Sequence, residues 1–143
     1  MIGLKIDKSM FFDRPKVQRA IDRGVRKVLS RFGAFVRTTA RHSMRKRKAV
    51  SQPGSPPSSH VGLLKKLLFF GFDAGRKSVV IGPTPLRGQA EAPPLLEYGG
   101  KTRIKHHGKN VVATYRARPF MGRAMRQTPI APLWRDSIRE KGA

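Results

Sequence analysis

The feature that most constrains the fold is an amphipathic run that stops at a proline-rich segment. Between residues 17 and 40 apolar side chains recur at spacings of three and four, and most cations fall elsewhere on the helical wheel. Asp13 is suited to cap such a helix, and Pro15 fits its first turn, where a missing N–H costs nothing. We therefore predict one helix from near residue 14 to about Lys48, roughly 50 Å long at about 1.5 Å per residue.

The end of this predicted helix is strongly basic and leads into a loop. No acidic residue occurs from Arg23 to Gln52, and cations are favoured near the negative end of a helix dipole. The following "QPGSPPSS" at 52–59 breaks both helix and ladder, so residues 51–61 are expected to form a flexible internal loop. A folded pattern resumes afterwards, and residues 1–143 are therefore interpreted as a single domain.

Two β-hairpins are predicted in the second half of the chain. Residues 67–82 place aromatic and β-branched runs around a turn at 73–77, and residues 102–117 have two extended runs flanking Gly108, with Asn110 available for the turn. The fold class is thus α+β, with a long N-terminal helix packed on an antiparallel sheet of about four strands and short C-terminal helices. Short helical stretches are expected at the start of 62–72, at 94–98, at 121–127 and at 132–141.

Composition narrows the classes of function. Thirty-one Lys and Arg against eight Asp and Glu give a net charge of +23, which strains a compact monomer and attracts polyanions. The chain has no cysteine, which excludes disulfides and thiolate metal sites. The longest apolar run, residues 67–72, is far too short to span a bilayer, so no membrane partner is expected.

No catalytic chemistry is predicted. General acid–base catalysis needs titratable groups in a shared pocket, and the acids are scattered along the chain without a paired spacing. Glu97, in "LLEYGG", is interpreted as a structural contact to an arginine. The adjacent His106 and His107 would point to opposite faces of a strand and cannot chelate one ion together. We expect no enzyme, no metal and no cofactor.

Direct nucleic-acid binding is the alternative that the charge leaves open. Cations that neutralise phosphates release counterions and add affinity that is independent of base sequence. Zinc-finger, RNP and GXXG signatures are missing from the sequence, which argues against sequence-specific recognition. The residues expected to contact DNA or an acidic partner are Arg41, Arg45, Lys46, Arg47 and Lys48.

The order of six short motifs carries a family resemblance. They are "TTARHSMRKRK", "PGSPPSSHVGLLKKLLFF", "VVIGP", "LLEYGG", "ARPFMGRAM" and "PLWRDSI". This series resembles the tail-completion, or neck, proteins of tailed bacteriophages, also described as minor tail or head–tail joining proteins, over about residues 10–140. The chain departs from that pattern at Gly122-Arg123, where a proline more often precedes the alanine, and in its unusually high charge.

The resemblance implies an architectural role without catalysis. Subunits of that family form a ring, commonly a hexamer, that joins the head connector or adaptor to the tail terminator and tail tube around the DNA channel. It implies a location in the virion after assembly in the host cytoplasm, with non-specific contact to genomic DNA. Core packing stays open for Phe120 and Met121. The interface residues expected from the resemblance are Pro56, Pro57, His60, Glu97, Tyr98, Arg118, Phe120 and Met121.

Overall fold

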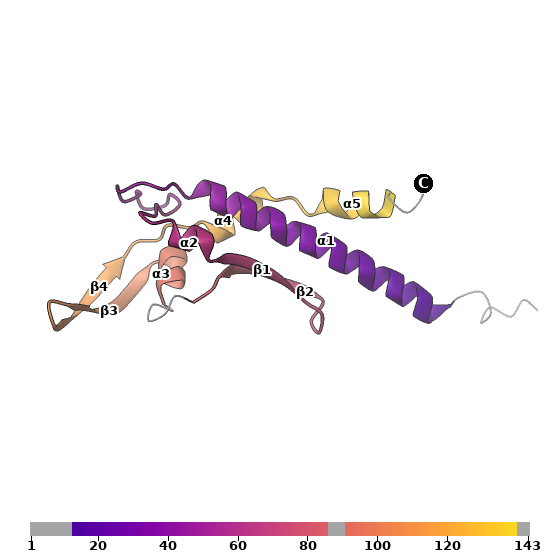
Figure 1. The fold of residues 1–143 in the computed structure, drawn as a ribbon, viewed down its shortest axis with the longest axis horizontal. Coiled ribbons are helices and arrows are strands. Elements are labelled where there is room, and N and C mark those ends of the chain that lie inside the picture. The colour runs from indigo at the N-terminus through magenta and orange to yellow at the C-terminus, as the bar shows by residue number, and fades with distance from the viewer. Residues whose placement is uncertain (1–12, 86–90, 140–143) are drawn as a thin grey trace, which may run out of the picture.

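Helix α1 (Arg14–Ser43) runs along most of the molecule in the computed structural model, which describes residues 13–85 and 91–139 (Figure 1). Helix α5 (Ala131–Arg139) lies along one side of α1, and the strands β1 (Leu68–Asp73) and β2 (Ser78–Pro83) lie along the other (Figure 1). Between these elements come the short helices α2 (Leu63–Lys66), α3 (Ala92–Tyr98) and α4 (Met121–Gln127). The expected end of the last helix at Lys141 lies outside the described residues.

The start of α1 is as predicted and its end is not. The Asp13 side chain accepts a hydrogen bond from the Lys16 N–H at 3.1 Å, which caps the helix. The helix ends at Ser43, however, because Met44 turns into extended backbone and buries its side chain in the core. The carbonyl of Arg45 then accepts from Ser59 N–H at 3.0 Å, so this backbone pairs with the following loop instead of continuing the helix. The prediction of helix through Lys48 was therefore wrong.

Strands β1 and β2 form an antiparallel hairpin whose inner face packs on α1. Phe70 and Val79 point to the helix at Gly33, where an added Cβ would come within 2.8 Å of both side chains. At the turn, the Asp73 carboxylate accepts from the N–H groups of Gly75 and Arg76, at 2.9 and 3.1 Å. The first predicted hairpin is confirmed.

Strands β3 (Gly100–His106) and β4 (Lys109–Tyr115) form the second predicted hairpin. Its turn consists of His107 and Gly108, both with positive φ (48° and 76°), as a tight hairpin turn requires. Asn110 lies in β4 and not in the turn. The α+β class with four strands is confirmed, but the two hairpins form two separate two-stranded sheets. The reason is that β3–β4 leaves α3 in another direction and projects beyond the β1–β2 sheet (Figure 1).

The core is small and lies where the second half of α1 meets β1 and α4. It contains Val36, Ala40 and Met44 from the α1 region, Leu68 from β1, and Phe120 and Ala124 at α4. Among the described residues, seven apolar side chains other than proline are buried, whereas fourteen large apolar side chains are exposed. Such side chains mark a surface for a partner where they are contiguous.

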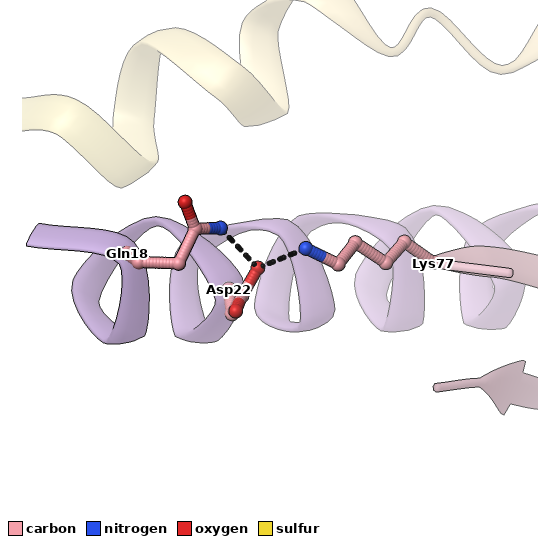
Figure 2. A network of polar contacts seen from close by, with 3 residues as sticks. All are labelled: Gln18, Asp22 and Lys77. Carbon is pink, nitrogen blue, oxygen red and sulfur yellow. Dashed lines mark hydrogen bonds and ion pairs between the residues drawn. The ribbon is translucent and has the colours of Figure 1, made fainter. Parts of the chain in front are cut away.

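An ion pair ties the turn of β1–β2 back to α1. Lys77 Nζ lies 2.7 Å from Asp22 Oδ1, which also accepts a hydrogen bond from Gln18 Nε2 at 3.1 Å; Figure 2 shows the three side chains. The hydrogen bond from Lys77 lowers the pKa of the Asp22 carboxyl below its ordinary value, with a smaller lowering by Gln18. Both partners are about half exposed, so the pair positions the turn more than it stabilises the fold.

Replacing Lys77 by methionine is expected to raise the pKa of Asp22. A lowered carboxyl pKa means that the pair contributes at neutral pH and that its contribution is lost as the pH falls through that pKa. A pH titration of the Asp22 carboxyl by NMR should show a higher midpoint in Lys77→Met than in the wild type. Lys109→Met, which removes an equal charge elsewhere, should leave that midpoint in place. Equal midpoints in wild type and Lys77→Met would show that the ion pair does not form.

Candidate interaction surfaces

Glu97 joins two helices through backbone contacts. Its Oε2 accepts from the N–H groups of Phe120 and Met121 at 2.9 and 3.0 Å, and its Oε1 accepts from Gly122 N–H at 2.8 Å. These are the free donors at the start of α4, where a helix also favours negative charge. The structure thus shows a structural contact of Glu97, as expected, but its hydrogen-bond donors are backbone N–H groups of α4 and not the expected arginine.

A second contact fastens the proline-rich segment to the chain that leaves β4. Arg118 Nε donates to the carbonyl of Ser51 at 2.9 Å, and Gly54 N–H donates to the carbonyl of Ala117 at 2.8 Å. Further along, Ser58 Oγ donates to the carbonyl of Ala49 at 2.6 Å. The segment 51–61 thus makes defined contacts in this structure, while its flexibility stays a prediction.

The motifs of the resemblance meet at these two contacts. "PGSPPSSHVGLLKKLLFF" is bonded through Gly54 to "ARPFMGRAM", and that motif is in turn bonded to Glu97 of "LLEYGG". Phe120, at 1% exposure, packs in the core, which is the alternative that the sequence left open, and Pro57 is also buried. Of the predicted interface residues, His60 and Tyr98 are exposed, Tyr98 at 83%. Those of intermediate exposure are Pro56, Glu97, Arg118 and Met121.

Sequence reasoning missed an apolar surface on β1–β2. The register places Phe69, Gly71, Val80 and Gly82 on the face turned away from α1, here called the outer face, with Asp73 and Ser78 on the same side at the turn. The Arg37 guanidinium lies 5.8 Å from the centre of the Phe69 ring. Phe69 and Val80 are 49% and 65% exposed, and a Cβ added at either glycine would meet no atom within 4 Å. A hollow of about 410 Å³ lies over it. The signal for this face was the uninterrupted apolar run at 67–72, which leaves apolar residues on both faces of the strand.

The predicted basic residues lie on both sides of the end of α1 in the sequence. Arg41 lies in the helix with intermediate exposure, whereas Arg45, Lys46, Arg47 and Lys48 follow it and are all exposed. A further cationic surface, not predicted, lies on the β3–β4 hairpin. It presents Lys101, Arg103 and Lys105, which are exposed and share one face of β3.

Two negative findings apply to residues 13–85 and 91–139. No three His, Asp or Glu side chains there come close enough together to hold a metal ion. No helix within these ranges has both the length and the apolar character needed to cross a membrane.

Comparison with known proteins adds no family assignment. A scan against protein-family models, a search of curated proteins and a search of solved structures each gave no match to this chain. The resemblance to phage neck proteins therefore stays a prediction.

Proposed function

We propose that this protein is a structural subunit of the neck or tail of a tailed bacteriophage, without catalytic activity. Copies form a ring, a hexamer by the resemblance, that joins the head connector to the tail tube around the DNA channel. The observation that carries the proposal is the outer face of β1–β2, an exposed apolar surface on a chain of net charge +23. Such a face is suited to contact a second copy, because its four residues carry no charge and Arg37, which lies 5.8 Å from the centre of the Phe69 ring, already donates to the Leu68 carbonyl.

The β1–β2 sheet leaves apolar surface that a neighbour could cover. An isolated two-stranded sheet is marginal in water, and packing on α1 gives β1–β2 the support that a pair of strands needs. Both β1 and β2 have a free edge, and packing on α1 covers only the inner face. Contact of the outer face with the next copy would bury Phe69 and Val80, which are left exposed in the single chain.

The experiment compares Val80→Asp with Val50→Asp. Both valines are exposed, at 65% and 74%, but only Val80 lies on the outer face. We expect wild type and Val50→Asp to form one discrete oligomer in light-scattering chromatography, and Val80→Asp to dissociate with at least about a tenfold weaker association, since a carboxylate would be desolvated. Thermal unfolding of the monomer should be unchanged by either substitution.

The same variants test the joining role. Phage particles assembled without this chain should appear in negative-stain images as tailless heads beside free tails. Wild type and Val50→Asp should restore joined particles, and Val80→Asp should not. A wild-type chain that stays monomeric at physiological ionic strength, with particles joined in its absence, would overturn the proposal.

The second candidate is a free nucleic-acid-binding protein that acts through phosphate contacts. It is favoured by the four consecutive cations at 45–48, which are exposed beyond the end of α1. Tight DNA binding by a monomer, with a steep dependence on salt, would support this candidate over the ring.

A further inference from the structure

We infer that the β3–β4 hairpin is a DNA-binding arm whose cationic face contacts the phosphates of duplex DNA. This goes beyond the proposed function, because the ring requires no DNA contact by this hairpin and the sequence assigned such contact to residues 41–48. The cationic face is defined as Lys101, Arg103 and Lys105.

The hairpin has the form of a free arm. Every residue from Lys105 to Val112 is exposed, and the hairpin projects from one end of the described molecule (Figure 1). Its turn at His107 and Gly108 is tight, so the tip adds little bulk beyond the two strands. A two-stranded ribbon of this kind fits the major groove of B-DNA, which is about 12 Å wide.

The cations are regularly spaced along one side of the ribbon. Alternate residues of a strand share a face and lie about 7 Å apart along it, so the three charges form a row. Directly opposite on β4, Thr114, Val112 and Asn110 supply no negative charge. None of the three cations has a hydrogen bond or ion pair with another described residue. Their charged groups are therefore available to bind a ligand.

Acidic groups are sparse around this face. The sequence has no Asp or Glu between Glu97 and Asp136. Glu91 is the acid that adjoins the base of the hairpin: it lines a shallow hollow with Lys101 and Arg103, and its Oε2 accepts from Thr102 Oγ1 at 2.7 Å. Glu91 thus lowers the positive potential at Lys101 and Arg103, whereas Lys105 lies nearer the tip and outside that hollow.

The contacts at the base of the hairpin bring a second group of cations to the same end. Gly54 is bonded to Ala117, two residues beyond β4, and the chain between α1 and Gly54 carries the exposed cations of 45–48. Both groups lie at the end of the molecule opposite the start of α1 (Figure 1). A polyanion held by the hairpin therefore lies near these four cations as well.

Duplex DNA fits this surface better than an acidic protein or RNA. Protein interfaces are depleted in lysine and have buried aromatic or apolar anchors, whereas Val112 is the one large apolar side chain in the cross-strand pairs of the cationic face. Rows of lysine and arginine are what phosphates bind. The deep and narrow major groove of RNA duplexes does not admit such a ribbon. The contacts predicted are to phosphates, so no base sequence should be preferred.

The test compares two triple variants with the same change of charge. Lys101, Arg103 and Lys105 are changed to glutamine in one, and the exposed Lys16, Arg19 and Arg23 of α1, at the other end of the molecule, are changed to glutamine in the other. Each is titrated against a fluorescent 30-base-pair DNA of mixed sequence, over a range of salt concentrations. All six side chains are exposed, and equal thermal unfolding midpoints confirm that both variants are folded.

The hairpin variant should bind the DNA about tenfold to a hundredfold more weakly at physiological salt. The slope of log K against log salt should fall by about 2.7, because three phosphate contacts are lost. The α1 variant should stay within about threefold of wild type, with its slope nearly unchanged, since distant charges are screened. Equal weakening in both variants would show diffuse attraction by the whole chain and would overturn the proposal.

Three other outcomes would also overturn it. The first is that the wild type does not bind DNA at physiological salt. The second is that the wild type binds an RNA duplex of the same length as tightly as it binds DNA. The third is that the hairpin variant loses more affinity for polyglutamate than for DNA. The proposed ring is tested separately from the proposed arm. A monomer that binds DNA through the hairpin would refute only the ring, and a ring that does not bind DNA would refute only the arm.

Discussion

Glu97→Ala is expected to lower the free energy of unfolding by about 3 kcal/mol, because it removes the acceptor of three backbone N–H groups at once. Met121 and Gly122 begin α4, whose Ala124 is buried in the core, so loosening this end disturbs the packing on α1. For a chain of this size the thermal midpoint should fall by about 10 °C. Thermal and urea unfolding, followed by circular dichroism, measure both quantities.

Two companion variants separate the cap from the loss of a charge. Glu91 is an exposed glutamate whose carboxylate accepts from the Thr102 hydroxyl, and Glu91→Ala should change stability by no more than about 0.5 kcal/mol. Glu97→Gln keeps one acceptor oxygen but presents an amide NH₂ to the remaining donors, and its loss should lie between the two. If Glu97→Ala and Glu91→Ala destabilise equally, the cap does not hold α4.

Two glycines of α1 should respond to alanine with opposite signs. Gly33→Ala places a Cβ 2.8 Å from Phe70 Cδ2 and from Val79 Cγ2, and such overpacking costs about 1–3 kcal/mol, more than the gain of about 1 kcal/mol in helix propensity. Gly33→Ala should thus destabilise the protein by about 1 kcal/mol. Gly24→Ala meets no atom within 4 Å and should stabilise it by about 0.5–1 kcal/mol.

Urea unfolding of the two variants under the same conditions provides the comparison. Since both positions lie within one helix, helix propensity alone would give the same sign at both. A stabilising effect of Gly33→Ala would mean that α1 does not approach the β1–β2 sheet as closely as the structure has it. A further loss in Gly33→Leu, which adds three more carbons at the contact, would agree with a tight interface.

Local signals were enough for the start of α1 and for both hairpins. The Asp13 cap acts within one turn of the helix, and the turns of the hairpins depend on residues within a few positions of one another. Such contacts follow from short stretches of sequence, since both partners are covalently close. The cations of the candidate DNA surface could also be seen in the sequence, including the alternation of Lys101, Arg103 and Lys105.

Contacts between distant segments could not be predicted in the same way. The basic residues after Ser43 favoured more helix, but burial of Met44 beside Leu68 and Phe120 ended it, and those partners lie far along the chain. A carboxylate can accept hydrogen bonds from an arginine or from backbone N–H groups equally well. The donors to Glu97 were selected only by the approach of α4 to α3. The sequence by itself determined the elements, the net charge and the cationic row, because these depend on composition and on near neighbours. Only the tertiary structure decided that the hairpins form separate sheets, that one apolar face is left uncovered, and that two basic segments lie at the same end of the molecule. The reason is that each of these features depends on packing between residues that are distant in the sequence.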